Sequence, residues 1–318
     1  MRFLAPFLSL VGVLLAIAMI TFAIATALPG DTAEIRVGKR DDLTFEQRAA
    51  LVAAERGRLG LDQPVPWQFV IWLGKAVQGD LGVQEGGGSV GKAVLERIIP
   101  SLELAFLTLA VSLPLAALLA LRSVRRGKRV FSVVVGQLST VGFVVPQFWL
   151  GILFVIFFAV LLGWLPASGY EPFRELPVEH VKRVIMPLIT LVIPTTAVFF
   201  HFMRQSLREA LGTQYIRTAR AKGLSETSVL YQHAFPNALL PSLTVLGVQF
   251  GQLLGGVVVV ERIFNWPGVG GLLIYSVERQ DFSTLIACVM AIAAAYVLMS
   301  TLIEIAYRMV DPRIRRAS

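Results

Sequence analysis

Six long apolar stretches alternate with polar segments along the chain. They lie at about 4–28, 101–121, 131–163, 185–207, 238–260 and 284–308. A helix rises about 1.5 Å per residue, so roughly 20 apolar residues cross the ~30 Å hydrocarbon core of a bilayer. The pattern therefore predicts an all-α integral membrane protein with six transmembrane helices.

The third stretch, 131–163, is too long for one straight crossing. Gly142 and Pro146 lie near its middle, and a proline interrupts the hydrogen bonds of a helix. We therefore expect a bend at this point, or an interfacial piece that leads into the membrane span.

The first stretch also resembles a signal peptide. Arg2 precedes it, and Ala25-Thr26-Ala27 is similar to a cleavage site. However, the apolar run that ends at Leu28 is far longer than the roughly 7–15-residue core of a signal peptide. The length favours a retained first transmembrane helix over a cleaved leader.

The segment between the first two spans, 29–100, is the only sizeable extramembrane piece. A helix is predicted over Leu43–Leu59, because Thr44 and Gln47 have the spacing of a capping box. Proline and glycine predict two irregular pieces after this helix. These are a turn at Asp62–Pro66 and a glycine-rich loop at Gln84–Ser89.

Composition and charge agree with a membrane protein. Hydrophobic residues make up 55% of the chain, charged residues 16%, and the mean hydropathy is +0.70, whereas a soluble domain carries about a quarter charged residues. With both termini cytoplasmic and Glu304 counted apart, the internal segments with the adjoining span ends hold 15 basic and three acidic residues, and the external loops with the adjoining span ends hold 14 basic and 17 acidic ones. This positive-inside asymmetry explains the net charge of +8 without nucleic-acid binding.

No arrangement of residues predicts catalysis. Gly86–Ala93 is close to a phosphate-binding P-loop, but Ala93 replaces the hydroxyl residue that would hold magnesium, and no strand precedes the loop. The histidines His180, His201 and His233 lack the spacing of a helical zinc site. We therefore expect a non-enzymatic protein with no cofactor of its own.

Two chemically distinctive residues lie within apolar stretches. Cys288 is the single cysteine, which excludes an internal disulfide, and we expect it to be a small buried apolar side chain. An ionisable residue such as Glu304 within a span raises a functional hypothesis by default. Because Arg308 follows it by one helical turn, a local ion pair near the interface is the favoured interpretation.

Glycines recur at every fourth position of the fifth span. They are Gly247, Gly251 and Gly255. This spacing places a smooth stripe on one helix face, along which another backbone can approach closely. We predict tight helix packing there, and a compatible functional interpretation is that the packed surface lines or gates a pathway.

The segment between the fourth and fifth spans has the pattern of a short, basic, amphipathic helix that is interrupted at Gly223. Its candidate residues are Tyr215, Arg217, Ala219, Arg220, Lys222, Gly223 and Leu224, and His233–Pro241, which includes Pro236, leads back into the membrane. Such a helix could lie on a membrane surface and be attracted to anionic lipid. It could equally protrude into a cytoplasmic partner.

This segment resembles the cytoplasmic coupling loop of the B-type permeases of dipeptide and oligopeptide ABC importers. In that family a Glu-Ala-Ala motif is followed by a glycine and then by an Ile-x-Leu-Pro-like ending. Gly223 stands at the glycine position, Ala219 at the second alanine, and His233–Pro236 at the ending. Arg217 and Thr218 replace the first two motif residues, so the role of the usual glutamate does not carry over directly.

Further matches to this family extend along essentially the whole chain. They are Leu28–Asp31, Leu59–Pro64, Gly79–Gly82, Pro146–Gly151, Phe264–Gly270 and Asp311–Arg313. The resemblance implies a type I ABC importer permease fold in the bacterial inner membrane, with both termini cytoplasmic. The expected organisation is a first transmembrane helix (1–28), an extracytoplasmic loop domain (29–100), a five-helix core (101–310) with its coupling loop at about 209–237, and a tail (311–318).

The resemblance also implies partners and a mechanism. The chain would form half of a translocation pathway that works by alternating access. A second homologous permease would complete a heterodimer, two ATPase subunits would hold ATP and magnesium, and an extracytoplasmic binding protein would deliver a small peptide.

Residue roles follow from the same resemblance. Gly223 would provide the turn of the coupling loop, although an ordinary helix C-cap is compatible with this. The basic residues of the loop would either pair with acids on an ATPase or only set the topology; these are Arg217, Arg220 and Lys222. The binding protein would dock on 29–100, 164–184 and 261–283, with Asn265, Trp266 and Pro267 as candidate contacts.

Two alternatives stay open. Importers of the same class also carry nickel, glutathione or other small solutes. A secondary transporter would need no ATPase, but proton-coupled transporters more often have several buried acids, and Glu304 is the clearest one in this chain.

Overall fold

The computed structural model of the chain describes residues 4–27, 33, 37, 44–60, 62–84, 87–125 and 127–310. These residues are helical apart from turns, loops and one isolated antiparallel bridge between Val83 and Ser89. Several predicted features lie at least partly outside the described residues. They are the matches at Leu28–Asp31 and Asp311–Arg313, the loop residue Gly86, and the side chain of Arg308, the predicted partner of Glu304.

Among the described residues, five helices are long and apolar enough to cross a membrane, and a bent helix pair makes up to six such spans. This confirms the all-α membrane fold. The chain forms two compact units, which comprise residues 1–101 with 267–297, and residues 102–266 with 298–318. The predicted division at residues 28, 100 and 310 concerns membrane topology, whereas these units are groups of residues in contact. The predicted division therefore stays a prediction.

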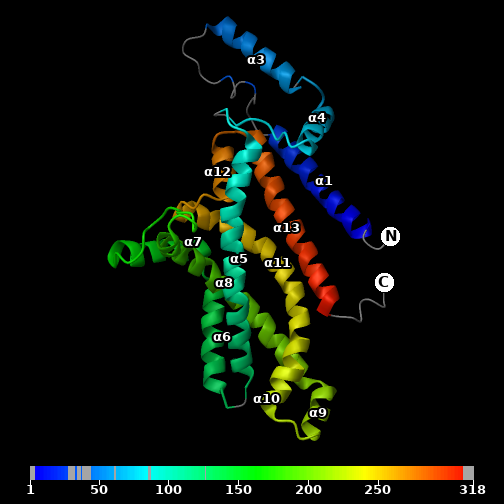
Figure 1. Ribbon diagram of the computed structural model, residues 1–318, viewed down its shortest axis with the longest axis vertical. Coiled ribbons are helices and arrows are strands. Elements are labelled where there is room, and N and C mark those ends of the chain that lie inside the picture. The colour runs from blue at the N-terminus through cyan, green and yellow to red at the C-terminus, as the bar shows by residue number, and fades with distance from the viewer. Residues whose placement is uncertain are drawn as a thin grey trace. The chain divides into compact units, whose positions relative to one another are not determined.

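The first unit contains α1 (Leu4–Ala27), α3 (Phe45–Leu59), α4 (Val65–Val77), the start of α5 (Val90–Val124), α12 (Val269–Glu278) and most of α13 (Phe282–Val310) (Figure 1). The predicted capping box of α3 is confirmed, since the Thr44 side chain accepts from the Gln47 backbone and the Gln47 side chain from that of Thr44. Cys288 is fully buried in an apolar cluster with Val90 and Leu272, as expected.

The sequence prediction missed the helix α4. Pro64 and Pro66 indicated a turn, but Pro64 is the N-cap of α4 and Pro66 lies in its first turn. A proline is tolerated there because the first backbone N–H groups of a helix have no intrahelical acceptor. In α4, Phe69 lies 5.5 Å (ring centroids) from Phe22 of α1, so α4 covers part of the first span.

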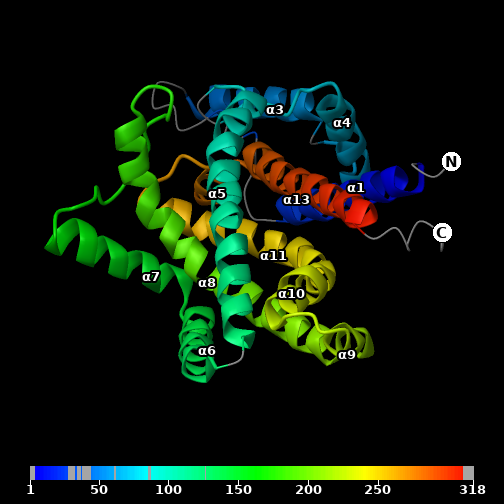
Figure 2. The ribbon, with the colours of Figure 1, turned by 60° about the horizontal axis from the view of Figure 1, so that its bottom comes forward.

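The second unit is organised around α8 (Pro177–Gly212), which packs against α6 (Arg129–Val144) and α11 (Phe235–Phe264). In the most apolar part of α8, 72% of the residues are buried, which marks it as the centre of this unit. At about 1.5 Å per residue, its 36 residues extend beyond the hydrocarbon core. The α9 segment follows α8 directly (Figure 2).

The predicted bend in the third span is confirmed. The break between α6 and α7 (Gln147–Phe154) turns the chain by 98°, and α7 continues into the π-helical segment η1 (Val155–Leu161). Pro146 caps α7, and the preceding Val145 is extended (φ −68°, ψ 125°), as expected for a residue before proline. Gly142 allows α6 to approach α8, because a Cβ there would lie 3.1 Å from Ile193 Cγ2.

Candidate functional site

The predicted coupling segment comprises α9 (Gln214–Ala221), α10 (Glu226–Ser228) and the π-helical segment η2 (Val229–Ala234), which leads into α11. The helix α9 is amphipathic. Ile216 and Ala219 are 0% and 7% exposed and face inward, whereas Arg217 is exposed. Tertiary packing of one apolar face therefore holds a helix that is too short to be stable alone.

Gly223 forms the turn that ends α9, as predicted. Its φ is +81°, its N–H bonds to Arg220 O (2.9 Å), and the N–H of Leu224 bonds to Ala219 O (3.3 Å). This is the Schellman pattern of a helix C-cap, which favours glycine because φ is positive. The turn and the C-cap are thus one structure, and the role of Gly223 in coupling stays a prediction.

Contacts within the segment tie its two ends together. The Arg220 side chain donates to both carboxylate oxygens of Glu226, at 2.9 and 3.2 Å. The Tyr215 hydroxyl donates to His233 O at 3.1 Å, next to the start of α11. Arg220 was one of the three basic residues expected either to pair with acids on an ATPase or only to set the topology, and in the structure its side chain is engaged by Glu226.

Two cations of the segment differ from Arg220. Among the described residues, the side chains of Arg217 and Lys222 make no hydrogen bond or ion pair, and both are exposed. Pro236 lies in the first turn of α11 and is exposed. The segment therefore presents an exposed basic surface beside a self-contained hydrogen-bonded turn.

Trp266 lies at the opposite end of α11, and its side chain is buried. It is 2% exposed, and its ring lies edge-on to Tyr170 (centroids 4.7 Å apart) and to His180 (5.9 Å). The preceding Asn265 is exposed and caps α11 with φ +48°. Burial removes Trp266 from the surface that a binding protein could touch, while docking on Asn265 and Pro267 stays a prediction.

The buried His180 and the partly exposed Glu103 form a polar pair beside this aromatic cluster. His180 Nε2 lies 2.9 Å from Glu103 Oε1, and Nδ1 lies 2.7 Å from Glu171 O. Because a carbonyl oxygen only accepts, Nδ1 carries a proton and donates it. Both ring nitrogens of His180 are therefore held by polar neighbours.

Tyr170 completes this cluster. Its hydroxyl donates to Glu103 Oε2 at 3.5 Å. Burial raises the pKa of Tyr170, and the Glu103 carboxylate raises it further, so the phenol stays protonated and keeps donating. Sequence reasoning missed the cluster because its members lie far apart in the chain.

Among the described residues, the predicted glycine stripe of α11 is open at Gly247 and Gly255. A Cβ at Gly247 would meet only Ile303 Cδ1, at 3.9 Å, and a Cβ at Gly255 would meet nothing within 4 Å. The glycine that is closely approached is Gly256, where a Cβ would overlap the side-chain amide of Gln147. Packing of the stripe, including Gly251, against another backbone stays a prediction.

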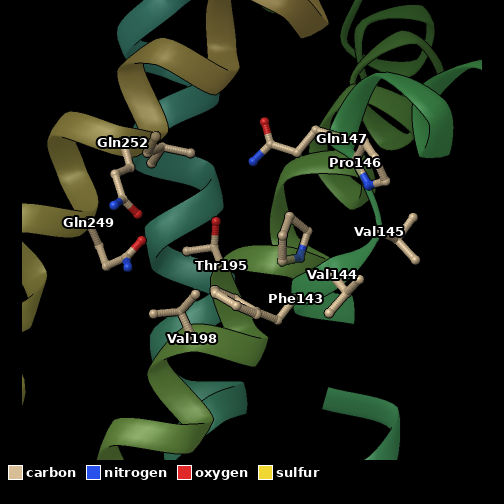
Figure 3. Close-up of a pocket in the computed structure, with 11 residues that line it drawn as sticks. Phe143, Val144, Val145, Pro146, Gln147, Thr195, Val198, Gln249 and Gln252 are labelled. Atoms are coloured by element: carbon tan, nitrogen blue, oxygen red, sulfur yellow. The ribbon is translucent and has the colours of Figure 1, made fainter. Parts of the chain in front are cut away.

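A groove beside Gly256 lies at the break between α6 and α7 (Figure 3). Its volume is about 270 Å³. Gln249 and Gln252 project into it from α11, Gln147 from the start of α7, and Thr195 from α8. The remaining lining residues are Phe143, Val144, Val145, Pro146, Pro194, Val198 and Leu253. The groove is therefore lined mainly by apolar side chains, and its polar side chains are the three glutamines and Thr195.

Comparison with known sequences assigns the chain to a family. Residues 112–316 match the family described as binding-protein-dependent transport system inner membrane component, and residues 1–98 match the N-terminal family of the same membrane component. The chain belongs to this family. It is thus a multi-pass inner membrane permease component, and the resemblance noted from the coupling segment is confirmed.

Individual relatives align with this permease over nearly its whole length. One, named "Probable peptide ABC transporter permease protein", is from Sinorhizobium fredii; it is 32% identical, with 96% of each chain covered. Another, a glutathione transport system permease protein of Salmonella choleraesuis, is 34% identical, with 97% of this chain and 96% of the relative covered.

A solved structure has the same fold. The crystal structure of an amino acid ABC transporter with histidines matches the permease with a TM-score of 0.52 and 19% identity, over 70% of this chain and 94% of that one. At this identity the likeness shows the fold alone.

Proposed function

We propose that this permease is one of two subunits that form the translocation pathway of an ATP-driven importer for small peptides. The family membership supports import that depends on a binding protein. The names of its relatives, a peptide permease and a glutathione permease, support a substrate with peptide bonds. Nickel and other solutes are the weaker alternative, because neither relative is named for them.

The observation that carries the proposal is the exposed basic turn of α9 and α10. It follows α8 and leads through η2 into α11, so a force on the turn reaches two helices that pack against each other. Arg217 and Lys222 have no partner among the described residues, so they offer positive charge to acids on an ATPase subunit. Closure of the ATPases would then drive alternating access as a rigid-body movement.

The orientation follows from charge. The positive-inside rule puts this basic turn and both termini in the cytoplasm. Asn265 then lies on the external side, where a substrate-binding protein delivers its ligand. A second, homologous permease would complete the pathway and cover the open glycine stripe of α11.

The proposal is tested by replacing Gly223 with proline in the complete importer. Proline fixes φ near −65°, whereas Gly223 has φ +81° and its N–H bonds to Arg220 O. We expect Gly223→Pro to abolish ATP-dependent peptide uptake into proteoliposomes while the protein still inserts into the membrane. Co-purification of the second permease should persist.

A control variant is available in the chain. Gly127, between α5 and α6, also has a positive φ, +80°, with nothing near the place of a Cβ. We expect Gly127→Pro to retain most of the uptake, because this loop is not part of the proposed ATPase contact. Undiminished uptake by Gly223→Pro, or equal losses in both variants, would remove the coupling assignment.

A further inference from the structure

Three carboxamide side chains converge on the groove at the α6–α7 break. Gln249 and Gln252 are one helical turn apart on α11, and Gln147 faces them from the start of α7 (Figure 3). The Thr195 hydroxyl lies between them. None of the described residues that line the groove is charged, so its polar surface consists of neutral donors and acceptors.

These amides lack partners within the chain. Over the part of the protein that the structure describes, the side chains of Gln147, Gln249 and Gln252 make no hydrogen bond. Each amide offers two N–H donors and one carbonyl acceptor. Gln249 and Gln252 also lie inside the apolar span 244–264, where an unsatisfied amide that faces lipid costs several kcal/mol.

Unpaired polar groups at membrane depth mark a pathway or a bundle interior. We propose that Gln147, Gln249 and Gln252 form a subsite that binds the backbone amides of a peptide as it crosses the membrane. This proposal rests on the import function proposed above. It adds which residues of the permease meet the peptide and which part of the peptide they recognise.

The chemistry of a carboxamide matches that of a peptide bond. Each group has an N–H donor and a carbonyl acceptor, so the two can exchange a pair of hydrogen bonds. Peptides with different side chains share only this backbone. A neutral amide subsite therefore accepts many peptides, and its modest net hydrogen-bond energies allow release.

The size of the groove fits part of a peptide. Pockets that enclose a drug-sized ligand have about 300–1,000 Å³, and this groove has about 270 Å³. It therefore holds a short stretch of backbone, and the second permease would enclose the remainder. Gly256 contributes by its lack of a side chain, because a Cβ would occupy the place of the Gln147 amide.

The test uses the complete importer in proteoliposomes, with the double variant Gln249→Met/Gln252→Met. Methionine keeps the length of the side chain but removes the amide. The probes are trialanine and a depsipeptide analogue, in which an ester replaces one of the two amides and removes its N–H donor. Uptake by the variant is divided by wild-type uptake for each probe, which cancels the preference of the binding protein.

We expect the variant to lose trialanine uptake about tenfold, which corresponds to about 1.4 kcal/mol, and depsipeptide uptake clearly less. ATP hydrolysis stimulated by the loaded binding protein should persist. The control is Gln137→Met, a glutamine that is exposed on α6 outside the groove, and it should leave the uptake of both probes unchanged.

Three results would overturn the subsite. These are unchanged uptake by the double variant, equal losses for both probes, and loss of the second permease on purification, which would make the amides part of the subunit interface. A wild-type complex without ATP-dependent uptake would instead refute the proposed function, and this appears before any variant is made.

Discussion

Polar residues near the two ends of the packed helices α8 and α11 differ in their contacts. At one end, His180 and Tyr170 both contact the Glu103 carboxylate beside the buried Trp266. At the other end, Arg220 is paired with Glu226, but Arg217 and Lys222 are exposed and make no such contact among the described residues. The first region is complete within the chain, whereas the second presents charge outward.

This difference separates structural from contact residues. A buried polar group that is fully hydrogen-bonded contributes to the fold, and its loss leaves partners unsatisfied. Exposed charges contribute little to stability, so a strong effect of their removal on transport would indicate an external partner. We therefore expect variants in the Trp266 cluster to lower stability, and variants in the coupling segment to lower transport.

The largest expected effect comes from Trp266→Ala. Truncating a buried aromatic side chain lowers the free energy of unfolding by about 3–5 kcal/mol, and Trp266 is only 2% exposed. The measurement is thermal unfolding of the purified permease in detergent, followed by circular dichroism. Trp164→Ala is the control, because Trp164 is 67% exposed and should change the stability by less than about 0.5 kcal/mol. Equal effects would show that Trp266 is not part of a packed core.

A smaller effect is expected from Glu103→Gln, which keeps the shape of the side chain but removes its charge. The Glu103 side chain is 24% exposed and that of His180 4%, so solvent screens part of the interaction. We expect a loss of about 1–3 kcal/mol. His180→Gln should cost less in the Glu103→Gln background than in the wild type, as a double-mutant cycle measures. Strictly additive losses would contradict the pairing.

Local patterns were sufficient to predict the turns. Thr44 with Gln47, Pro146 and Gly223 each act on neighbours a few residues away, through a cap, a missing N–H or a positive φ. The structure shows each of these features as the sequence predicted. The exception is α4, because proline has opposite meanings inside a helix and in its first turn.

Long-range polar contacts could not be predicted in the same way. His180 meets Glu103 from 77 residues away, and the guanidinium of Arg204 donates to Ser132 Oγ at 2.6 Å across 72 residues. Charge counting assigned Arg204 only to the positive-inside pattern. Such contacts depend on the rotation of each helix about its axis, which decides the face that packs against a neighbour. A single sequence with uncertain helix boundaries does not specify that rotation.

The convergence of the groove amides was hidden for the same reason. Gln249 and Gln252 share a helix face by their spacing, but Gln147 joins them only because the chain turns by 98° at Pro146. The adjacent glycines Gly255 and Gly256 were a usable sign in the sequence that another group approaches α11 closely at this point. The predicted stripe included Gly255, whereas the close approach is at Gly256.

The smallest effect on stability is expected from the double variant Arg217→Ala/Lys222→Ala, with a change below about 0.5 kcal/mol. Yet this variant should lower ATP-dependent uptake several-fold, because it removes both exposed charges of the proposed ATPase contact. Arg220→Ala is the matched control, since it removes a cation that Glu226 already pairs, at a cost of about 0.2–1 kcal/mol. Uptake and thermal unfolding are measured on the same preparations.

If Arg220→Ala lowers uptake as much as the double variant does, the net charge of the loop matters rather than individual contacts, and topology alone explains the basic residues. If only the double variant lowers uptake, the charges that have no partner among the described residues are the ones that an external partner uses.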